Sequence, residues 1–295
     1  MLQNKDSGKN SEKKERTKKA FVVSKRFGLI LLGILLFLLV FLYIQNQYLV
    51  VSTYEYMNEA IPENLNGYRI VQISDLHNTN FGIGNKRLIH KIKKLNPDMI
   101  VITGDIVDGT HTDVSAAVSF VQAAVEMAPV YYVTGNHEHW LNKSDKERLF
   151  QGLKACGCVI LANKYEKVDG FYIVGLLEEN LRDKHLPKLM EEINSKEEDA
   201  FTVLLAHKPE NLILYAENGV DLVFCGHAHG GQFILPYFGP VFSPDQGFWP
   251  KLVMGVHQKD DTTMVISRGL GNSSFPFRLF NYPEIVCVEL KTTQE

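Results

Sequence analysis

Eight side chains of metal-ligand type occur in short motifs that follow one another along the chain. The motifs are Asp75-x-His77, Gly104-Asp105, Gly135-Asn136-His137, a lone His207 and Gly226-His227-Ala228-His229. Each motif follows a run of residues typical of a buried strand, and strand ends meet at one edge of an open α/β sheet. Carboxylate, amide and imidazole donors without thiolate suit Mn²⁺, Fe or Zn²⁺. The pattern therefore predicts a site for two metal ions, and an enzyme.

The spacing within the motifs suggests how the ligands pair. Residues two apart in an extended segment point the same way, so Asp75 and His77 can bind one ion together. His227 and His229 can do the same if their segment is extended. A glycine precedes several ligand positions and lets the chain turn sharply off the end of a strand.

The elements that would position these motifs alternate between strands and helices. We expect strands at 68–74, 99–103, 130–134, 171–175, 201–206, 222–225, 263–267 and 285–290. We expect helices at 86–95, 114–127, 145–155, 186–194 and 210–218. This alternation predicts an α/β domain. Residues 230–256 interrupt this alternation. They are rich in Gly, Pro and aromatic residues and predict an ordered loop or hairpin beside His227. The aromatic rings of this segment either pack against one another or contact a membrane.

The N-terminus has a different character from the rest of the chain. The first 26 residues hold nine Lys or Arg against three acidic residues, and 27–44 is an apolar run without a charge. Such a run crosses most of a bilayer as a helix, and a cleaved signal peptide is the main alternative. The positive-inside rule keeps the basic tail in the cytoplasm. We expect a tail at 1–26, a single-pass cell-membrane anchor at 27–45, a linker at 46–67 and an extracytoplasmic domain at 68–295.

Charge and cysteine content exclude some classes of function. The whole chain carries −3 and the tail +6, which leaves about −9 for the remainder. An acidic domain of this kind disfavours a nucleic-acid partner, which needs a basic face. The four cysteines form no CxxC pair and predict no disulfide framework. The oligomeric state is not indicated.

The ordered motifs ISDLH, ITGDIVDG, VTGNHE, LAHKPE and CGHAHGGQ resemble the calcineurin-like metallophosphoesterase family over nearly all of 68–295. The segments at 267–271 and 283–285 look like its membrane-associated or exported bacterial branch, which includes lipid-A-pathway UDP-diacylglucosamine pyrophosphatases. The resemblance implies a four-layer α/β sandwich of two mixed sheets flanked by helices. It also implies that Asp105 bridges two divalent ions. The first ion would be held by Asp75, His77, Asp105 and His229, and the second by Asp105, Asn136, His207 and His227.

The same resemblance implies a mechanism. Two adjacent cations would bind the phosphate, lower the pKa of a shared water and stabilise in-line displacement. His137 would protonate the leaving oxygen, and Asp108 would orient His137 and raise its pKa. Gly109 and Thr134 stand where the protein Ser/Thr phosphatase branch has phosphate-clamping arginines, so that activity is disfavoured. Arg268 and Arg278 are alternative candidates for phosphate contact, with a structural role equally open.

The predicted function is a membrane-anchored phosphoesterase that hydrolyses a phosphomonoester, phosphodiester or pyrophosphate bond. Its partners would be the membrane and a phosphorylated small molecule or lipid, with a lipid-linked or cell-envelope substrate favoured. Two alternatives stay open: a phosphodiesterase that acts on a soluble nucleotide, and a non-catalytic surface binding protein on the same fold.

Overall fold

The chain divides into two compact units, Met1–Ile44 and Gln45–Glu295. The computed structural model describes residues 5–177, 184–273 and 275–293, so residues 1–4 of the predicted basic tail lie outside it. The first unit is a helix, α1 (Lys5–Gln47), which continues into the first residues of the second unit. Its segment Lys25–Gln47 is long and apolar enough to cross a membrane, and its apolar window is not buried. One N-terminal apolar helix is thus present where the sequence predicts it.

The second unit is built on two six-stranded sheets. The first has the order β1 (Val50–Met57), β16 (Glu284–Lys291), β2 (Arg69–Ile73), β3 (Met99–Thr103), β4 (Val130–Val133) and β5 (Val159–Ile160). The second has the order β14 (Gly255–Lys259), β15 (Thr262–Ile266), β9 (Leu222–Cys225), β8 (Thr202–Leu205), β7 (Phe171–Gly175) and β6 (Lys164–Val168). Both sheets are mixed, since β16 runs antiparallel to β2, and β14 and β6 run antiparallel to their neighbours.

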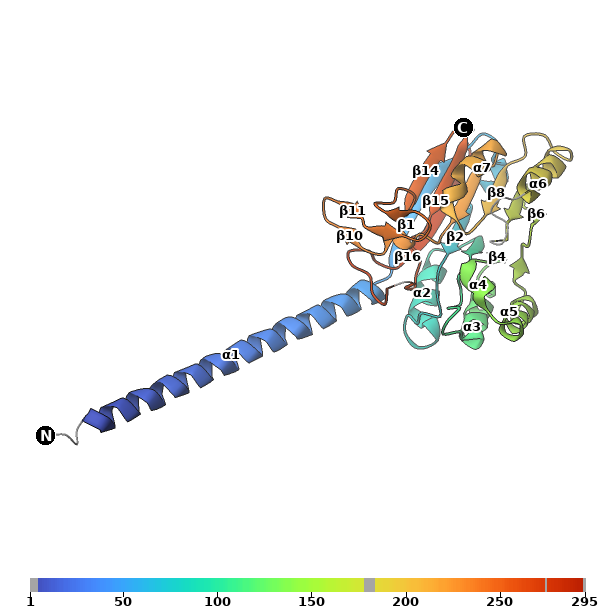
Figure 1. Cartoon of the computed structure of the whole chain (residues 1–295). Coiled ribbons are helices and arrows are strands. Elements are labelled where there is room, and N and C mark those ends of the chain that lie inside the picture. The colour runs from blue at the N-terminus through green and yellow to red at the C-terminus, as the bar shows by residue number, and fades with distance from the viewer. Residues whose placement is uncertain (1–4, 178–183, 274, 294–295) are drawn as a thin grey trace. The chain divides into compact units, whose positions relative to one another are not determined.

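Helices cover the outer faces of the two sheets. The helices of this unit are α2 (Lys86–Lys94), α3 (Val114–Val125), α4 (Asn136–Trp140), α5 (Lys143–Ala155), α6 (His185–Asn194) and α7 (Leu212–Glu217). The first sheet packs against α2, α3 and α5, which lie side by side in Figure 1, and the second packs against α6 and α7. A third apolar cluster fills the space between the sheets, with Val101 from β3 and Val203 from β8 among its residues. The predicted four-layer arrangement is confirmed.

The segment 46–67, predicted as a linker, contains a strand of the first sheet. Residues Val50–Met57 form β1, which pairs in parallel with β16 at the edge of the sheet. The polar residues Ser52 and Glu55 obscure this strand in the sequence, but an edge strand can expose alternate side chains. The linker prediction was wrong here, and compact packing begins at Gln45.

The aromatic stretch 230–256 forms two small hairpins, as expected of an ordered loop. The first pairs β10 (Ile234–Leu235) with β11 (Gly239–Pro240), and the second pairs β12 (Phe242–Ser243) with β13 (Gly247–Phe248). The strands β5, β6 and β14 are short or partly exposed, and the sequence pattern does not predict them. None of them carries a predicted ligand.

Candidate metal centre

The seven predicted ligands lie together where strands of the two sheets end. Asp75 and His77 follow β2, Asp105 follows β3 and Asn136 follows β4, all in the first sheet. His207 follows β8, and His227 and His229 follow β9, in the second sheet. The six acidic and histidine side chains are buried. The site therefore joins the carboxyl ends of parallel strands from both sheets.

The donor atoms form two neighbouring sets. Asp75, His77 and His229 make one set, and Asp105, His207 and His227 make another, with the donor atoms of each set within 4.8 Å of one another. The Asp105 carboxylate also lies 3.7 Å from His77 Nε2, so it stands between the sets. A third group, His77, Asp105 and His137, overlaps both. His227 and His229 thus belong to different sets.

Hydrogen bonds orient two of these imidazoles and the carboxamide. The Thr103 carbonyl accepts from His207 Nδ1 at 2.7 Å, which turns Nε2 toward Asp105 Oδ2 at 3.3 Å. The Asn136 carboxamide oxygen lies 3.1 Å from the same Nε2. His227 directs Nδ1 toward this group, at 3.2 Å from His207 Nε2. These contacts leave ring nitrogens and oxygens converging on one position.

The ligand turns are not extended, contrary to the expectation from residue spacing. Asp75, His77, Asp105, His227 and His229 all have φ between 46° and 66°, in the left-handed region. Such conformations cost roughly 1–3 kcal/mol each and persist only where the surrounding structure enforces them. Backbone bonds enforce them here, for example from Asp75 N to the Gly104 carbonyl at 3.1 Å and from His77 N to the Asp105 carbonyl at 3.0 Å.

Two glycines are required by close packing. A Cβ on Gly135 would lie 2.3 Å from Asp105 Oδ1, and a Cβ on Gly226 would lie 1.9 Å from Ser74 Oγ. Neither glycine has a positive φ. These two glycines therefore let neighbouring turns pack closely against the predicted ligands. A sharp backbone turn, the reason expected from the sequence, matters less at these positions.

Glu138 organises two of the ligand turns, and the sequence analysis did not assign it a role. Its fully buried carboxylate accepts backbone N–H bonds from Gly135 at 2.7 Å and from Asp105 and Ile106 at 2.9 Å, with Val107 at 3.4 Å. Burial, followed by the charge of Asp105, raises the pKa of Glu138 to about 7. The position directly after Asn136-His137 is the signal that could have identified it.

His137 lies against the donor sets, and its surroundings differ from the expectation. Gly109 N donates to His137 Nδ1 at 3.0 Å, whereas Asp108 Oδ1 lies 3.9 Å away and instead accepts bonds from Thr110. Burial lowers the pKa of His137, although Asp105 and Asp108 act in the opposite direction. The ring also contacts Trp140, with centroids 4.3 Å apart. Asp108 therefore acts on His137 through its charge, without a direct hydrogen bond.

Burial and charge set the protonation of the ligands. Burial lowers the pKa of His77 to about 4 and that of His227 to about 3, and it raises the pKa of Asp75 to about 6. Burial also tends to raise the pKa of Asp105, but its interactions with the neighbouring imidazoles, led by His207, together outweigh burial and hold that pKa well below its usual range. Neutral imidazoles around an ionised carboxylate are the protonation states that bind a divalent cation.

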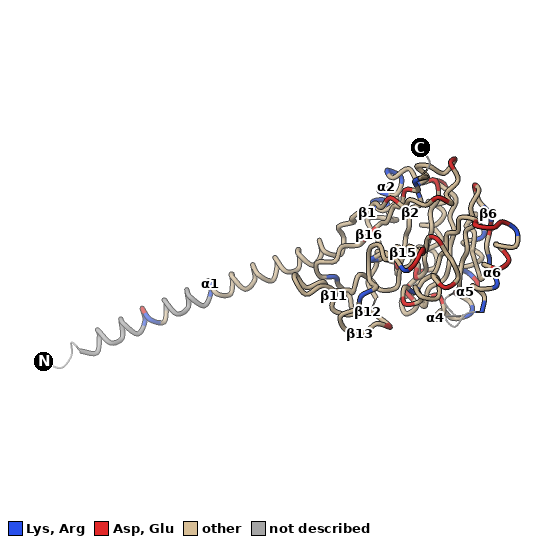
Figure 2. The backbone as a smooth tube through the Cα atoms, turned by 90° about the horizontal axis from the view of Figure 1, so that it is seen from above, with Lys and Arg blue, Asp and Glu red and all other residues tan. Residues whose placement is uncertain are grey.

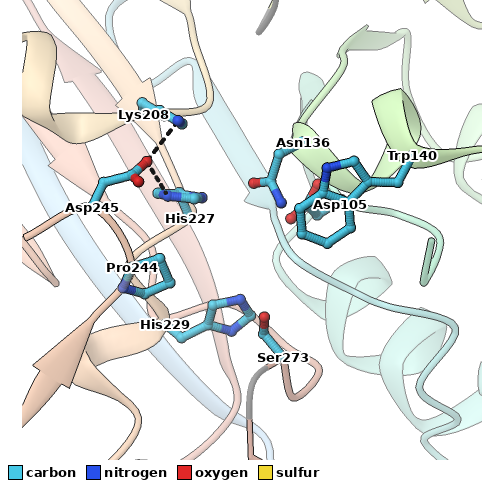
Figure 3. A pocket seen from close by; sticks show the side chains of 9 residues that line it. All are labelled: Asp105, Asn136, Trp140, Lys208, His227, His229, Pro244, Asp245 and Ser273. Carbon is cyan, nitrogen blue, oxygen red and sulfur yellow. Dashed lines mark hydrogen bonds and ion pairs between the residues drawn. The ribbon is translucent and has the colours of Figure 1, made fainter. Parts of the chain in front are cut away.

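A pocket of about 310 Å³ opens onto the donor sets (Figure 3). Its lining includes Asp105, Asn136, Trp140, Lys208, His227, His229, Pro244, Asp245 and Ser273. Asp245, from the turn of the second hairpin, lies 3.1 Å from His227 Nε2 and 2.6 Å from Lys208 Nζ. Lys208 is thus a cation beside the site that the sequence analysis missed, although it directly follows His207.

The two arginines considered for phosphate contact serve the structure. Arg278 is fully buried and donates to the carbonyls of Arg268 and Gly271, with Nη2 3.4 Å from His229 Nδ1. Arg268 donates to Glu284 Oε1 at 3.0 Å. Neither arginine lines the pocket. Arg278 supports the turn that carries His229.

Comparisons with known proteins agree with this geometry. The family model of calcineurin-like phosphoesterases matches residues 68–231, more than half of the chain. The metallophosphoesterase YkuE of Bacillus subtilis is 29% identical, with 80% of this chain and 83% of that protein covered. The phosphodiesterase YaeI of Escherichia coli is 25% identical, with 77% and 84% covered.

The name of a further relative describes a transmembrane protein. The transmembrane protein with metallophosphoesterase domain of Danio rerio is 29% identical, with 79% of this chain and 55% of that protein covered. The family match and the names of these relatives agree with a pocket lined by clustered Asp, Asn and His side chains. The chain belongs to the calcineurin-like phosphoesterase family and is a phosphoester hydrolase.

Proposed function

We propose that this protein is a membrane-anchored phosphoesterase, dependent on two divalent metal ions, that acts on a lipid-linked or cell-envelope substrate. The observation that carries the proposal is the pair of neighbouring donor sets with Asp105 between them, in the lining of the pocket. The bond cleaved is a phosphomonoester, a phosphodiester or a pyrophosphate. The likeness to lipid-A-pathway pyrophosphatases favours the last on sequence motifs alone.

The residues present fit a two-metal site. Imidazole nitrogens of His77 and His229 face each other at 3.2 Å, an approach that a shared cation would stabilise. Asp75, His77, Asp105 and His229 would hold one ion, and Asp105, Asn136, His207 and His227 the other. Bound there, Mn²⁺, Fe or Zn²⁺ would neutralise phosphate charge and lower the pKa of a water. The oxygen and nitrogen donors suit all three metals.

The side chains around the donor sets would bind and protonate the substrate. Because Gly109 N donates to His137 Nδ1, a neutral His137 carries its proton on Nε2, from which it would protonate the leaving oxygen. Asp108 would favour the positive charge on this ring from 3.9 Å. Lys208 would attract the phosphate, since it is a cation in the pocket lining. Asn136 would polarise the phosphate beside its ion.

The membrane part of the proposal is supported by α1 and by the name of the zebrafish relative. The nine basic residues before the apolar run favour a cytoplasmic tail and an extracytoplasmic catalytic domain. We place the tail at 1–26 and the anchor at 27–45. The catalytic domain then begins near Gln45 and includes β1.

The test uses the full chain, purified in detergent and supplied with Mn²⁺. We expect hydrolysis of p-nitrophenyl phosphate or bis-p-nitrophenyl phosphate, and loss of that activity in Asp105→Ala. The exposed Asp260→Ala variant, which removes an ion pair with Lys259, is the matched control. Failure to hydrolyse both compounds with full metal content, or an unchanged rate in Asp105→Ala, would contradict the proposal. Comparing micelle-embedded with water-soluble phosphodiesters separates lipid from soluble substrates.

A further inference from the structure

We propose that an uncharged aromatic surface beside the metal pocket binds the surface of the bilayer that the apolar helix enters, and so brings lipid phosphate to the site. The inference rests on the proposed anchor and phosphoesterase function, and it names the surface that recognises the lipid. Six exposed rings define this aromatic surface: Tyr237, Phe238, Phe248, Trp249, Phe275 and Phe280.

The composition of the two hairpins is unusual for a protein surface in water. Residues 230–249 contain one charged side chain, Asp245, so the hairpins are otherwise tan in Figure 2. Tyr237 and Phe238, between β10 and β11, are 105% and 73% exposed, and Trp249 is 56% exposed. A purely local core would bury these rings. Clustered exposed apolar side chains instead indicate an interaction site.

The aromatic surface is tied to the point where the chain leaves the apolar run. Asn46, two residues after Ile44, accepts hydrogen bonds through Oδ1 from Asn272 Nδ2 at 2.8 Å and from Arg278 N at 3.2 Å. Phe275 lies in the sequence between these two donors. If the apolar run crosses the bilayer, Asn46 lies at the membrane–water interface. The segment that carries Phe275 is then held next to this interface by its two hydrogen bonds to Asn46.

Backbone and side-chain bonds join the two hairpins to that segment. Gln232 Nε2 donates to the Phe275 carbonyl at 3.1 Å, and the Phe233 ring packs against Phe275 with centroids 5.0 Å apart. Val241 N donates to the Phe233 carbonyl at 2.9 Å, and Trp249 N donates to the Val241 carbonyl at 3.0 Å. The exposed rings therefore stand on one connected support.

The same support reaches the metal pocket. Pro244 and Asp245, between β12 and β13, line the pocket, and Asp245 contacts His227 at 3.1 Å (Figure 3). Phe248 and Trp249 follow directly on the other side of this turn. A bilayer surface held by these rings would therefore adjoin the mouth of the pocket, where a lipid head group could present its phosphate.

A bilayer suits this surface better than a second copy of the chain or another protein. Trp and Tyr rings favour the membrane interface, where the ring is partly desolvated and its polar atom stays hydrated. The covalent link through Asn46 makes contact with the same bilayer an intramolecular event, with an effective concentration in the range of about 1 mM for a short connection. Any other partner must be gathered from solution.

The experiment uses the two tryptophans of the chain as reporters. Full-chain Trp140→Phe, with Trp249 as its one tryptophan, is reconstituted into vesicles with and without brominated phosphatidylcholine. We expect Trp249 to lose more than half of its emission in brominated vesicles. In Trp249→Phe, Trp140 reports on the metal pocket and should lose much less. Tyr237→Ser/Phe238→Ser, added to Trp140→Phe, should weaken quenching of Trp249, whereas Ile213→Ser on α7 should not.

Two outcomes would overturn the inference. If Trp249 is not quenched by brominated lipid, the surface does not contact the bilayer. If it is instead shielded from aqueous iodide in proportion to the protein-to-lipid ratio, a second copy covers it. The proposed function is scored separately on the unsubstituted chain in the same vesicles, because Trp140 lines the pocket, by resistance of the protein to carbonate extraction and by hydrolysis of bis-p-nitrophenyl phosphate. If either of these two assays fails, the quenching of Trp249 still decides whether the aromatic surface contacts the bilayer.

Discussion

Replacing Glu138 with Gln should weaken the metal centre without touching a ligand. The carboxylate receives its backbone bonds through two oxygens, one serving Gly135 and Asp105 and the other serving Ile106 and Val107. An amide keeps one oxygen and turns an N–H₂ group toward the other pair of donors. The loss of two bonds to the charged carboxylate and the unsatisfied buried N–H groups correspond to roughly 2–4 kcal/mol of folding free energy.

Glu138 supports the turns that carry Asp105 and Asn136. The loss of its backbone bonds should therefore also lower the affinity for metal ions. Removing outer supports of metal ligands typically costs about 10–100-fold in metal affinity or activity. We would measure Mn²⁺ affinity by calorimetry on the metal-depleted full chain, and kcat/KM on bis-p-nitrophenyl phosphate. A pH of 8 is suitable, because the raised pKa of Glu138, about 7, leaves the carboxylate ionised there.

The matched control for this prediction is Glu191→Gln, an exposed position on α6. It changes the charge of the protein by the same amount and leaves the ligand turns intact. If Glu138→Gln bound Mn²⁺ and melted like the control, Glu138 would not hold these turns. The buried N–H groups of Gly135, Asp105, Ile106 and Val107 would then not depend on this carboxylate.

Three further changes test the site. His137→Gln should lower kcat on bis-p-nitrophenyl phosphate by about 10²–10⁴-fold with metal content unchanged, and a normal kcat would rule out His137 as the acid. Lys208→Ala should lower kcat/KM by about tenfold, the rate equivalent of ~1.4 kcal/mol, chiefly through KM, and an unaltered KM would remove Lys208 from the substrate site. In EDTA, calorimetry should show Tm falling from pH 7 to pH 4, because the lowered pKa values of His77 and His227, about 4 and 3, leave the unfolded chain binding more protons below its usual His pKa of 6.5. The raised pKa values of Asp75, about 6, and Glu138, about 7, act in the opposite direction and reduce this fall, and a Tm that rises toward pH 4 would contradict the expected balance.

The pattern of buried strands was readable because it is local. Runs such as Phe171–Gly175 are fully buried and have a neighbouring strand on each side, and the sequence predicts the bounds of this strand correctly. Val50–Met57 mixes polar with aromatic and β-branched residues, and its partner β16 lies at the far end of the chain. Since no local signal indicates that pairing, the sequence predicts a linker where the structure has a strand. Every second side chain along most of β1 is exposed, so the composition of this segment suits an edge strand as well as a linker.

The sequence by itself determined the family, the order of the motifs and the identities of the side chains that meet at the strand ends. The tertiary structure decided how those side chains are used. It puts His227 and His229 in left-handed turns where an extended segment was expected, sets Glu138 beneath the turns that carry Asp105 and Asn136, and buries Arg278 where a phosphate contact was considered. These outcomes depend on left-handed turns and on packing between two sheets, in which atoms distant in the chain compete for the same small volume. Residue spacing carries no information about that competition.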